Sequence, residues 1–177
     1  MSLTRVKKTI YGWKAAYIIV KKIENLKAYY VKCPVLVKLR INRGTKVVTP
    51  NDSNFIFGIK HRSSRAHVEA VYFIEDTTFE KPLPEDTVVH SYWDHSYRYC
   101  IGDTIRPKFM FDEDSNAACS SGIHFFDDYG AADRYNQFNG IPFEFIERNW
   151  VVQAELRDNY LKDRKFYNEK KKKETKK

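Results

Sequence analysis

The stretch that decides the fold of this chain is Val35-Leu-Val-Lys-Leu-Arg-Ile41. Its odd-numbered residues are all apolar, whereas its even-numbered residues include Lys38 and Arg40. Because successive side chains of a strand point to opposite faces, one face of this segment is apolar and the other is mixed. Such alternation is typical of a half-buried strand in an antiparallel sheet.

Similar segments on both sides of it predict a chain made mainly of strands. We expect strands over residues 13–21, 66–74, 123–126 and 150–156, and a hairpin joining residues 96–100 to 104–109. The composition agrees, since 12 Phe and 12 Tyr but only 7 Gly favour sheet. A short helix is expected from an N-cap at Asp127 or Asp128 to about Tyr135.

These elements predict an α+β fold, mainly an antiparallel sheet with few short helices, in one domain over residues 1–160. The sequence holds no internal repeat, P-loop or dinucleotide fingerprint. Residues 161–177 are expected to be a basic C-terminal tail, helical or disordered.

The positive charge is concentrated in that tail. Residues 164–177 hold eight Lys or Arg and two Glu, which account for six of the eight net positive charges. We expect the densest run to act as an electrostatic arm; it consists of Lys170, Lys171, Lys172 and Lys173. Such a run can be a solvated end, a nuclear localisation signal, or a non-specific contact with nucleic acid, acidic lipid or an acidic protein surface.

Three cysteines without a CxxC pair argue against a disulfide framework and for a reducing compartment. The first residues lack the apolar run of a signal peptide, and no apolar run approaches the roughly 20 residues that cross a bilayer. We therefore expect an intracellular protein without a membrane span.

The candidate site is Cys119-Ser-Ser-Gly-Ile-His124, which brings a thiol and an imidazole to the entrance of a strand. Cys119 and His124 would act as nucleophile and base if their side chains meet in space. The alternative is a buried structural thiol. Gly122 is expected to adopt a positive φ in the intervening turn. No residues show a convincing metal-ligand spacing, so we expect no metal.

Arg62 and Arg65 are the candidate phosphate-binding residues. They frame two serines immediately before the strand that starts at Ala66, where guanidinium groups and hydroxyls could hold a phosphate. The alternative is a solvated loop that pairs with the acidic segment 112–114.

A resemblance to a known family rests on three segments: residues 99–112, Cys119-Ser-Ser-Gly-Ile-His-Phe-Phe126, and Ala131 to Tyr135. They resemble a family of uncharacterised domains that is commonest in large DNA viruses of eukaryotes, with the motif C-x-x-G-I-H-F-F. Shorter relatives occur in phages and bacteria, sometimes beside pentapeptide repeats. His61 stands where that family usually has Cys. The resemblance implies a viral origin, a place in the host cytoplasm or the virion, and no assigned activity.

A second resemblance concerns Gly122-Ile-His-Phe125 and the later Ala132 and Tyr135. This stretch is similar to the G-I-Y-F…A-x-x-Y region of ADP-ribosyltransferases, although His124 replaces the usual Tyr. The resemblance implies that His124 takes the position of the aromatic residue on the nicotinamide. In that family a later Glu assists the transfer, and the resemblance implies Glu147, Glu144 or Glu155 for this role.

The leading hypothesis is a non-enzymatic viral protein with an interaction or structural role, for example as a component of the virion. It would dock on an acidic partner through its tail. The partner would be a protein, such as a capsid component, or an acidic surface; the tail could also bind nucleic acid non-specifically. The alternative is an ADP-ribosyltransferase-like or other nucleotide-handling enzyme or sensor with its site in residues 122–135. Neither hypothesis names a resident cofactor.

Overall fold

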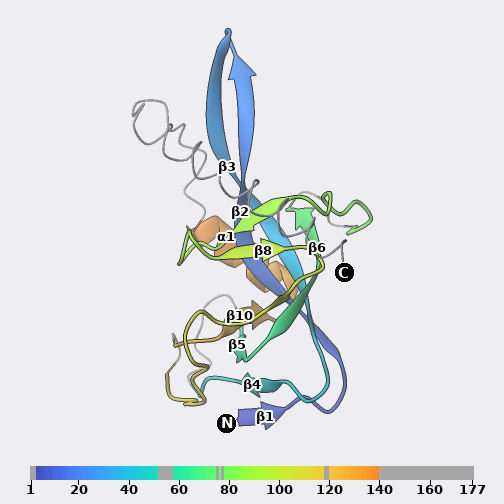
Figure 1. Cartoon of the computed structure of the whole chain (residues 1–177), viewed down its shortest axis with the longest axis vertical. Helices are drawn as coiled ribbons and strands as arrows, with labels where there is room; N and C mark the ends of the chain where they lie inside the picture. Colours follow the sequence, from blue (N-terminus) through green and yellow to red (C-terminus); the bar gives the residue numbers. More distant parts are fainter. Residues whose placement is uncertain (1–2, 52–57, 75, 77, 118–119, 140–177) are drawn as a thin grey trace, which may run out of the picture.

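The computed structural model describes residues 3–51, 58–74, 76, 78–117 and 120–139. Within these residues a ten-stranded antiparallel sheet runs in the order β1-β4-β5-β10-β2-β3-β6-β9, with β7 and β8 attached beside β2 (Figure 1). The mainly antiparallel part of the expected fold is therefore confirmed. The expected strand over residues 150–156 and the basic tail lie outside the described residues, and the domain boundary after residue 160 stays a prediction.

Most of the elements are short, and only β2 and β3 are long. The elements are β1 (Leu3–Arg5), β2 (Ile10–Glu24), β3 (Lys27–Ile41), β4 (Lys46–Val48), β5 (Lys60–Ser63), β6 (Ala66–Phe73), β7 (Val88–His90), β8 (Arg98–Cys100), β9 (Thr104–Ile105), β10 (Ile123–Phe126) and α1 (Tyr129–Asn139).

β2 and β3 form one long hairpin that extends through the molecule. Their pairing is continuous from Ile10↔Ile41 to Glu24↔Lys27. Asn25 and Leu26 close the hairpin, both with positive φ (50° and 64°), as a two-residue type I′ turn requires. Beyond the pairs that β2 makes with β7 and β3 makes with β6, the hairpin projects from the body as a two-stranded arm (Figure 1).

The two faces of β3 bury different clusters. Val35, Val37, Leu39 and Ile41 are fully buried on one face, as the alternation predicts. On the opposite face Leu36 packs in a second cluster beneath α1, with Phe126, Ala131, Ala132 and Tyr135. The face expected to be mixed is therefore covered in part by the helix.

β10 joins these two clusters. Phe125 enters the first and Phe126 the second, so this strand is covered on both sides. Four register pairs connect β10 to β5, but a single pair, Phe126↔Trp13, connects it to β2. Gly12 permits this approach, because a Cβ atom there would lie only 2.2 Å from Cδ2 of Phe125.

A gap separates β10 from β7 along the edge of β2 that faces away from β3. β10 reaches that edge at Trp13, and β7 begins to pair at Tyr17. Lys14, Ala15 and Ala16 lie between these two contacts. The discontinuity positions the site described below.

The helix begins as expected. Asp128 is the N-cap, since its carboxylate accepts hydrogen bonds from the backbone N–H groups of Gly130 (3.0 Å) and Ala131 (3.1 Å). Asp127, the other candidate, instead accepts a hydrogen bond from Nε2 of His61 at 2.9 Å.

Two local expectations are wrong. Residues 96–100 and 104–109 do not form a hairpin, because β8 pairs with β7 and β9 pairs with β6. Gly122 is not among the glycines with positive φ. It is needed for close packing, because a Cβ at this position would lie 2.9 Å from Cβ of Arg62.

The contact between Gly12 and Phe125 can be tested by a double-mutant cycle. Gly12→Ala should lower the free energy of unfolding by about 1–3 kcal/mol, the typical cost of overpacking a core. Phe125→Leu in the same chain should reduce this cost, because the smaller side chain gives the new methyl group room. Unfolding in urea gives the four free energies.

Gly44→Ala is the matched control. Gly44 has a φ of 81° and nothing within 4 Å of the position of its Cβ, so its substitution strains the backbone without a clash. The free-energy changes of Gly44→Ala and Phe125→Leu should add in the double variant. If those of Gly12→Ala and Phe125→Leu also add, the proposed contact between Gly12 and Phe125 is contradicted.

Candidate functional site

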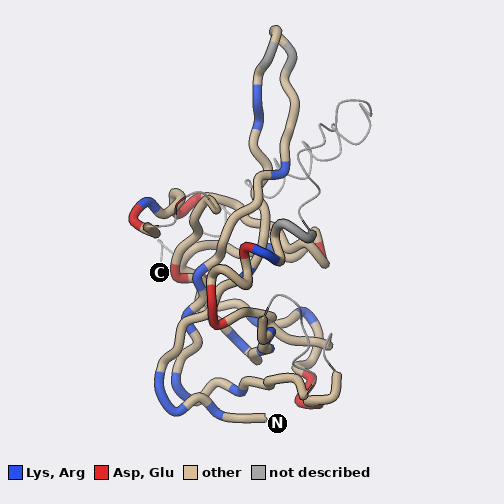
Figure 2. The backbone as a smooth tube through the Cα atoms, turned by 180° about the vertical axis from the view of Figure 1, so that it is seen from behind, with Lys and Arg blue, Asp and Glu red and all other residues tan. Residues whose placement is uncertain are grey.

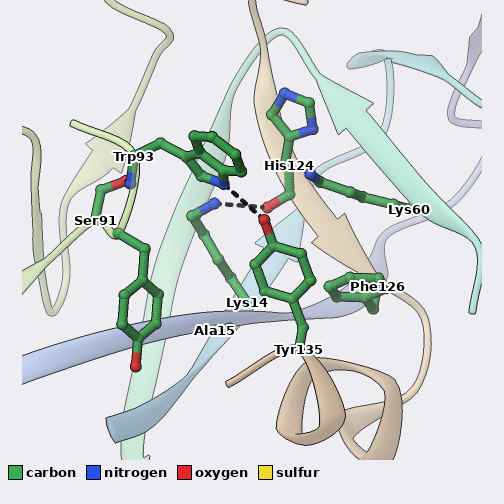
Figure 3. A pocket seen from close by; sticks show the side chains of 9 residues that line it. Lys14, Ala15, Lys60, Ser91, Trp93, His124, Phe126 and Tyr135 are labelled. Carbon is green, nitrogen blue, oxygen red and sulfur yellow. Dashed lines mark hydrogen bonds between the residues drawn. The ribbon is translucent and has the colours of Figure 1, made fainter. Parts of the chain in front are cut away.

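A cavity of about 350 Å³ opens at the gap between β7 and β10. Its walls come from β2, β5, β8 and β10 and from the loops around residues 91–97, 107–109 and 120–122. A hollow of about 20 Å³ adjoins it and continues toward Phe126 and Tyr135 (Figure 3). The residues that line both are Lys14, Lys60, Ser91, Trp93 and His124.

Lys14 lies at the centre of the site. Its Nζ donates a hydrogen bond to the backbone oxygen of His124 at 3.2 Å (Figure 3). The same Nζ lies 5.5 Å from the centre of the Tyr99 ring. Burial, together with the charge of Lys60, lowers the pKa of Lys14 from 10.5 to about 7. A substantial fraction of this amine is therefore neutral near physiological pH.

Lys60 approaches the same space from β5. The residue is only 8% exposed, and its Nζ lies 5.1 Å from the centre of the Tyr135 ring. The aromatic face offers partial stabilisation of the ammonium group. Two lysines that disfavour each other's charge thus line one enclosed space.

Among the described residues that line the cavity, only Asp94 carries a carboxylate. That carboxylate is engaged by Nζ of Lys108 (3.1 Å) and by the side chain and backbone N–H of Ser96. These bonds hold the pKa of Asp94 below its ordinary value. Asp94 is therefore matched to Lys108, and the lining carries more positive than negative charge.

His124 presents a neutral imidazole. Its Nε2–H donates to the backbone oxygen of Ser120 at 2.8 Å, which fixes the tautomer and leaves Nδ1 as an acceptor. Nδ1 is buried without a hydrogen-bond partner. Burial and the nearby charges of Lys60 and Lys14 lower the pKa of His124 to about 3.

Aromatic residues form the outer wall. Trp93 is 74% exposed and Phe109 is 73% exposed at the cavity. The indole of Trp93 is nevertheless fixed, because its Nε1–H donates to the Tyr135 hydroxyl at 2.6 Å (Figure 3). Burial raises the pKa of Tyr97 to about 12 and that of Tyr99 further, so both hydroxyls stay protonated.

The residues predicted from sequence fall into three groups. His124 lies in the cavity. Arg62 is fully buried and contacts the acidic loop instead, through the backbone oxygen of Asp114 and the carboxylate of Asp112 at 3.9 Å. Arg65 donates to Oγ1 of Thr45 at 3.3 Å. Phosphate binding by these two arginines stays a prediction.

The other predicted site residues, Cys119, Glu147, Lys170, Lys171, Lys172 and Lys173, lie outside the described residues. Across the described part of the chain, no three His, Cys, Asp or Glu side chains gather as metal ligands. In that same part, no helix has the length and apolar character needed to cross a bilayer.

Sequence reasoning missed Lys14 and Trp93 as site residues. The signal for Lys14 was present, because it is the single cation in the otherwise apolar run of residues 13–20. A charged residue at such a position is rarely buried without a partner or a role. Trp93 gave no comparable signal, since it lies in a polar loop.

The family described as "Family of unknown function (DUF5758)" matches residues 4–132, more than two thirds of the chain. An uncharacterized protein of Acanthamoeba polyphaga mimivirus is 32% identical over 100 residues, which span 56% of this chain and 61% of that protein. No solved structure matches the chain. The expectation of an uncharacterised domain with viral relatives is confirmed, whereas its motif and the phage and bacterial relatives stay predictions.

Replacing Lys14 should stabilise the fold. Its folded-state pKa lies below its unfolded-state value, so the charged form destabilises the fold fully below pH 7, and this cost fades between pH 7 and 10.5. Lys14→Met should therefore raise the free energy of unfolding at pH 6 by about 1–2 kcal/mol, with a smaller gain at pH 9. Thermal and urea unfolding at both pH values measure this.

Lys38→Met is the matched control, because Lys38 is half-buried on the neighbouring strand and also lies over a ring, that of Tyr11 at 5.1 Å. Comparing the two variants at both pH values isolates what Lys14 contributes. A Lys14→Met effect independent of pH would show that the buried charge is not the cause.

Proposed function

Since the chain belongs to this family of unknown function (DUF5758), we propose its function from its own cavity: it binds a small molecule that carries an aromatic ring and a phosphate group. Nucleotides are one class of such molecules. The observation that carries the proposal is that two neighbouring lysines, Lys14 and Lys60, line the same cavity.

An anion would offset the repulsion between the two lysines. Lys60 lowers the pKa of Lys14, so each ammonium raises the cost of the other. A phosphate bound beside Lys60 would offset this repulsion, because an opposite charge stabilises the ammonium group of Lys60. An anion that offsets this repulsion therefore gains binding free energy from the site.

The lining also selects for more than charge. Trp93 and Phe109 offer exposed aromatic faces at the cavity, onto which a planar ring can stack. His124 also lines the cavity, and its neutral imidazole adds no further positive charge to the lining. A few polar groups within a largely apolar wall are typical of small-molecule sites.

The expected ligand class can be tested with AMP, adenosine and inorganic phosphate. AMP should bind more tightly than either fragment, because it satisfies the aromatic wall and the lysines together. At 100 times its Kd it should stabilise the protein by about 2.7 kcal/mol, which is a shift of several degrees in Tm. Calorimetric titration and thermal unfolding of the full chain measure this.

Lys14→Met and Trp93→Ala should each weaken AMP binding at least about tenfold, while Lys38→Met should leave it unchanged. A response to AMP that matches the response to phosphate and survives both cavity substitutions would sink the proposal. It would indicate a general attraction of a basic chain for anions.

The arm favours a second candidate, the interaction or structural protein expected from the sequence. Ile23 is 68% exposed and Leu26 fully exposed at its tip. Figure 2 shows Lys and Arg, in blue, spaced along the hairpin. A projecting ribbon with apolar and basic side chains suits docking on an acidic protein surface, alone or together with the basic tail.

A shortened arm separates the two candidates. Deleting residues 21–24 and 27–30 removes four cross-strand pairs while keeping Asn25-Leu26 and the alternation of faces. AMP binding should persist, and retention on an immobilised acidic polymer should fall. Deleting residues 164–177 gives the contribution of the tail; if neither deletion changes retention, the docking role is wrong.

A further inference from the structure

We propose that Lys14 is a nucleophilic amine that forms an imine with a carbonyl group of the ligand, so that the ligand class is a phosphorylated aromatic aldehyde. This inference rests on the proposed function, because the same cavity must hold the ring and the phosphate. It adds a covalent step that binding alone does not require.

The position of Lys14 supports the step. Its Nζ reaches the cavity through the gap between β7 and β10, beside the ring of Tyr99. One of its N–H groups is donated to the backbone oxygen of His124, which fixes the direction of the amine. The lone pair of a neutral amine that donates this hydrogen bond is not directed at that oxygen and stays available for attack.

The electrostatic environment supports it as well. Reactive lysines are activated by desolvation and by a neighbouring cation, because both favour the neutral nucleophile. Lys14 has both, the second from Lys60. Lys60 can then hold the phosphate of the ligand while Lys14 attacks its carbonyl carbon.

The other ionisable groups that line the cavity do not compete for this role. His124 is neutral on β10, and Tyr99 on β8 stays protonated. Lys108 is engaged by Asp94 at 3.1 Å. Of the two remaining lysines, Lys14 has a lowered pKa, and Lys60 is assigned to the phosphate.

The step is balanced without a redox partner. The lone pair of Nζ forms the C–N bond as the carbonyl π electrons move to oxygen, and a proton passes from nitrogen to that oxygen to give a carbinolamine. The C–O bond then breaks, the nitrogen lone pair forms the C=N bond, and one water molecule leaves. The reverse reaction with water releases the aldehyde unchanged.

Pyridoxal 5′-phosphate is the probe, because it combines an aromatic ring, a phosphate and an aldehyde. The full chain is incubated with it at pH 7, reduced with borohydride and digested for peptide mass spectrometry. The adduct should form at Lys14 at least about tenfold faster than at any other lysine, since ordinary lysines with a pKa near 10.4 are almost fully protonated at this pH.

Matched reagents and variants make the result decisive. Pyridoxine 5′-phosphate, which has no aldehyde, should bind and protect Lys14 from labelling. Lys14→Met should abolish the selective adduct, and Lys38→Met should leave it in place. The rate of labelling at Lys14 should reach half its maximum near pH 7 rather than near pH 10.

The outcomes separate this inference from the proposed function. If pyridoxine 5′-phosphate and AMP bind but the aldehyde labels lysines without preference for Lys14, the imine is wrong and the binding function stands. If neither compound binds and labelling is unselective, both are wrong. Selective labelling that pyridoxine 5′-phosphate blocks supports both.

Discussion

Phe125 occupies the space that the absent side chain of Gly12 leaves open, and the position of β10 depends on that contact. β10 has only one register pair with β2, so hydrogen bonding alone holds it weakly there. The ring of Phe125 in one cluster and that of Phe126 in the other fix the strand from both faces. Because β10 stops at Trp13 and β7 begins at Tyr17, the same packing that orders the sheet also leaves its edge open at Lys14.

The site departs from the rules that the rest of the fold obeys. Elsewhere in the described residues, several cations have carboxylate partners, as Arg40 has Glu69 and Lys46 has Glu113. At the cavity, Lys14 instead lies beside another cation and has a neutral backbone oxygen as its acceptor. Unfavourable electrostatic arrangements of this kind reduce stability and are characteristic of functional sites, where the charge of a ligand can offset them.

The fold could be predicted from sequence where the signal is periodic and local. The alternation over residues 35–41, the opposed faces of Phe125 and Phe126, and the Asp128 cap all follow from the geometry of one element. The turn at Gly102, between residues 96–100 and 104–109, suggested a hairpin that does not form. Turn chemistry indicates a reversal of the chain but does not identify which strands pair. That turn instead exchanges backbone hydrogen bonds with Val68 of β6. The site could be predicted only in part. His124 was a candidate from its sequence context, but Lys14, Lys60 and His124 come together through pairing of strands that are distant in sequence, which no local pattern predicts.

The hairpin that carries Lys14 also carries the arm, and this has an evolutionary consequence. Past the last pairs with β6 and β7, the arm pairs with no third strand in the described part of the chain. Residues can therefore be gained or lost two at a time in each of its strands without turning any side chain to the other face. A single deletion between Trp13 and Tyr17 would instead reverse the faces of β2 and carry Lys14 out of the gap. Relatives can therefore diverge freely in the reach of the arm while selection holds the spacing of the few residues beneath it.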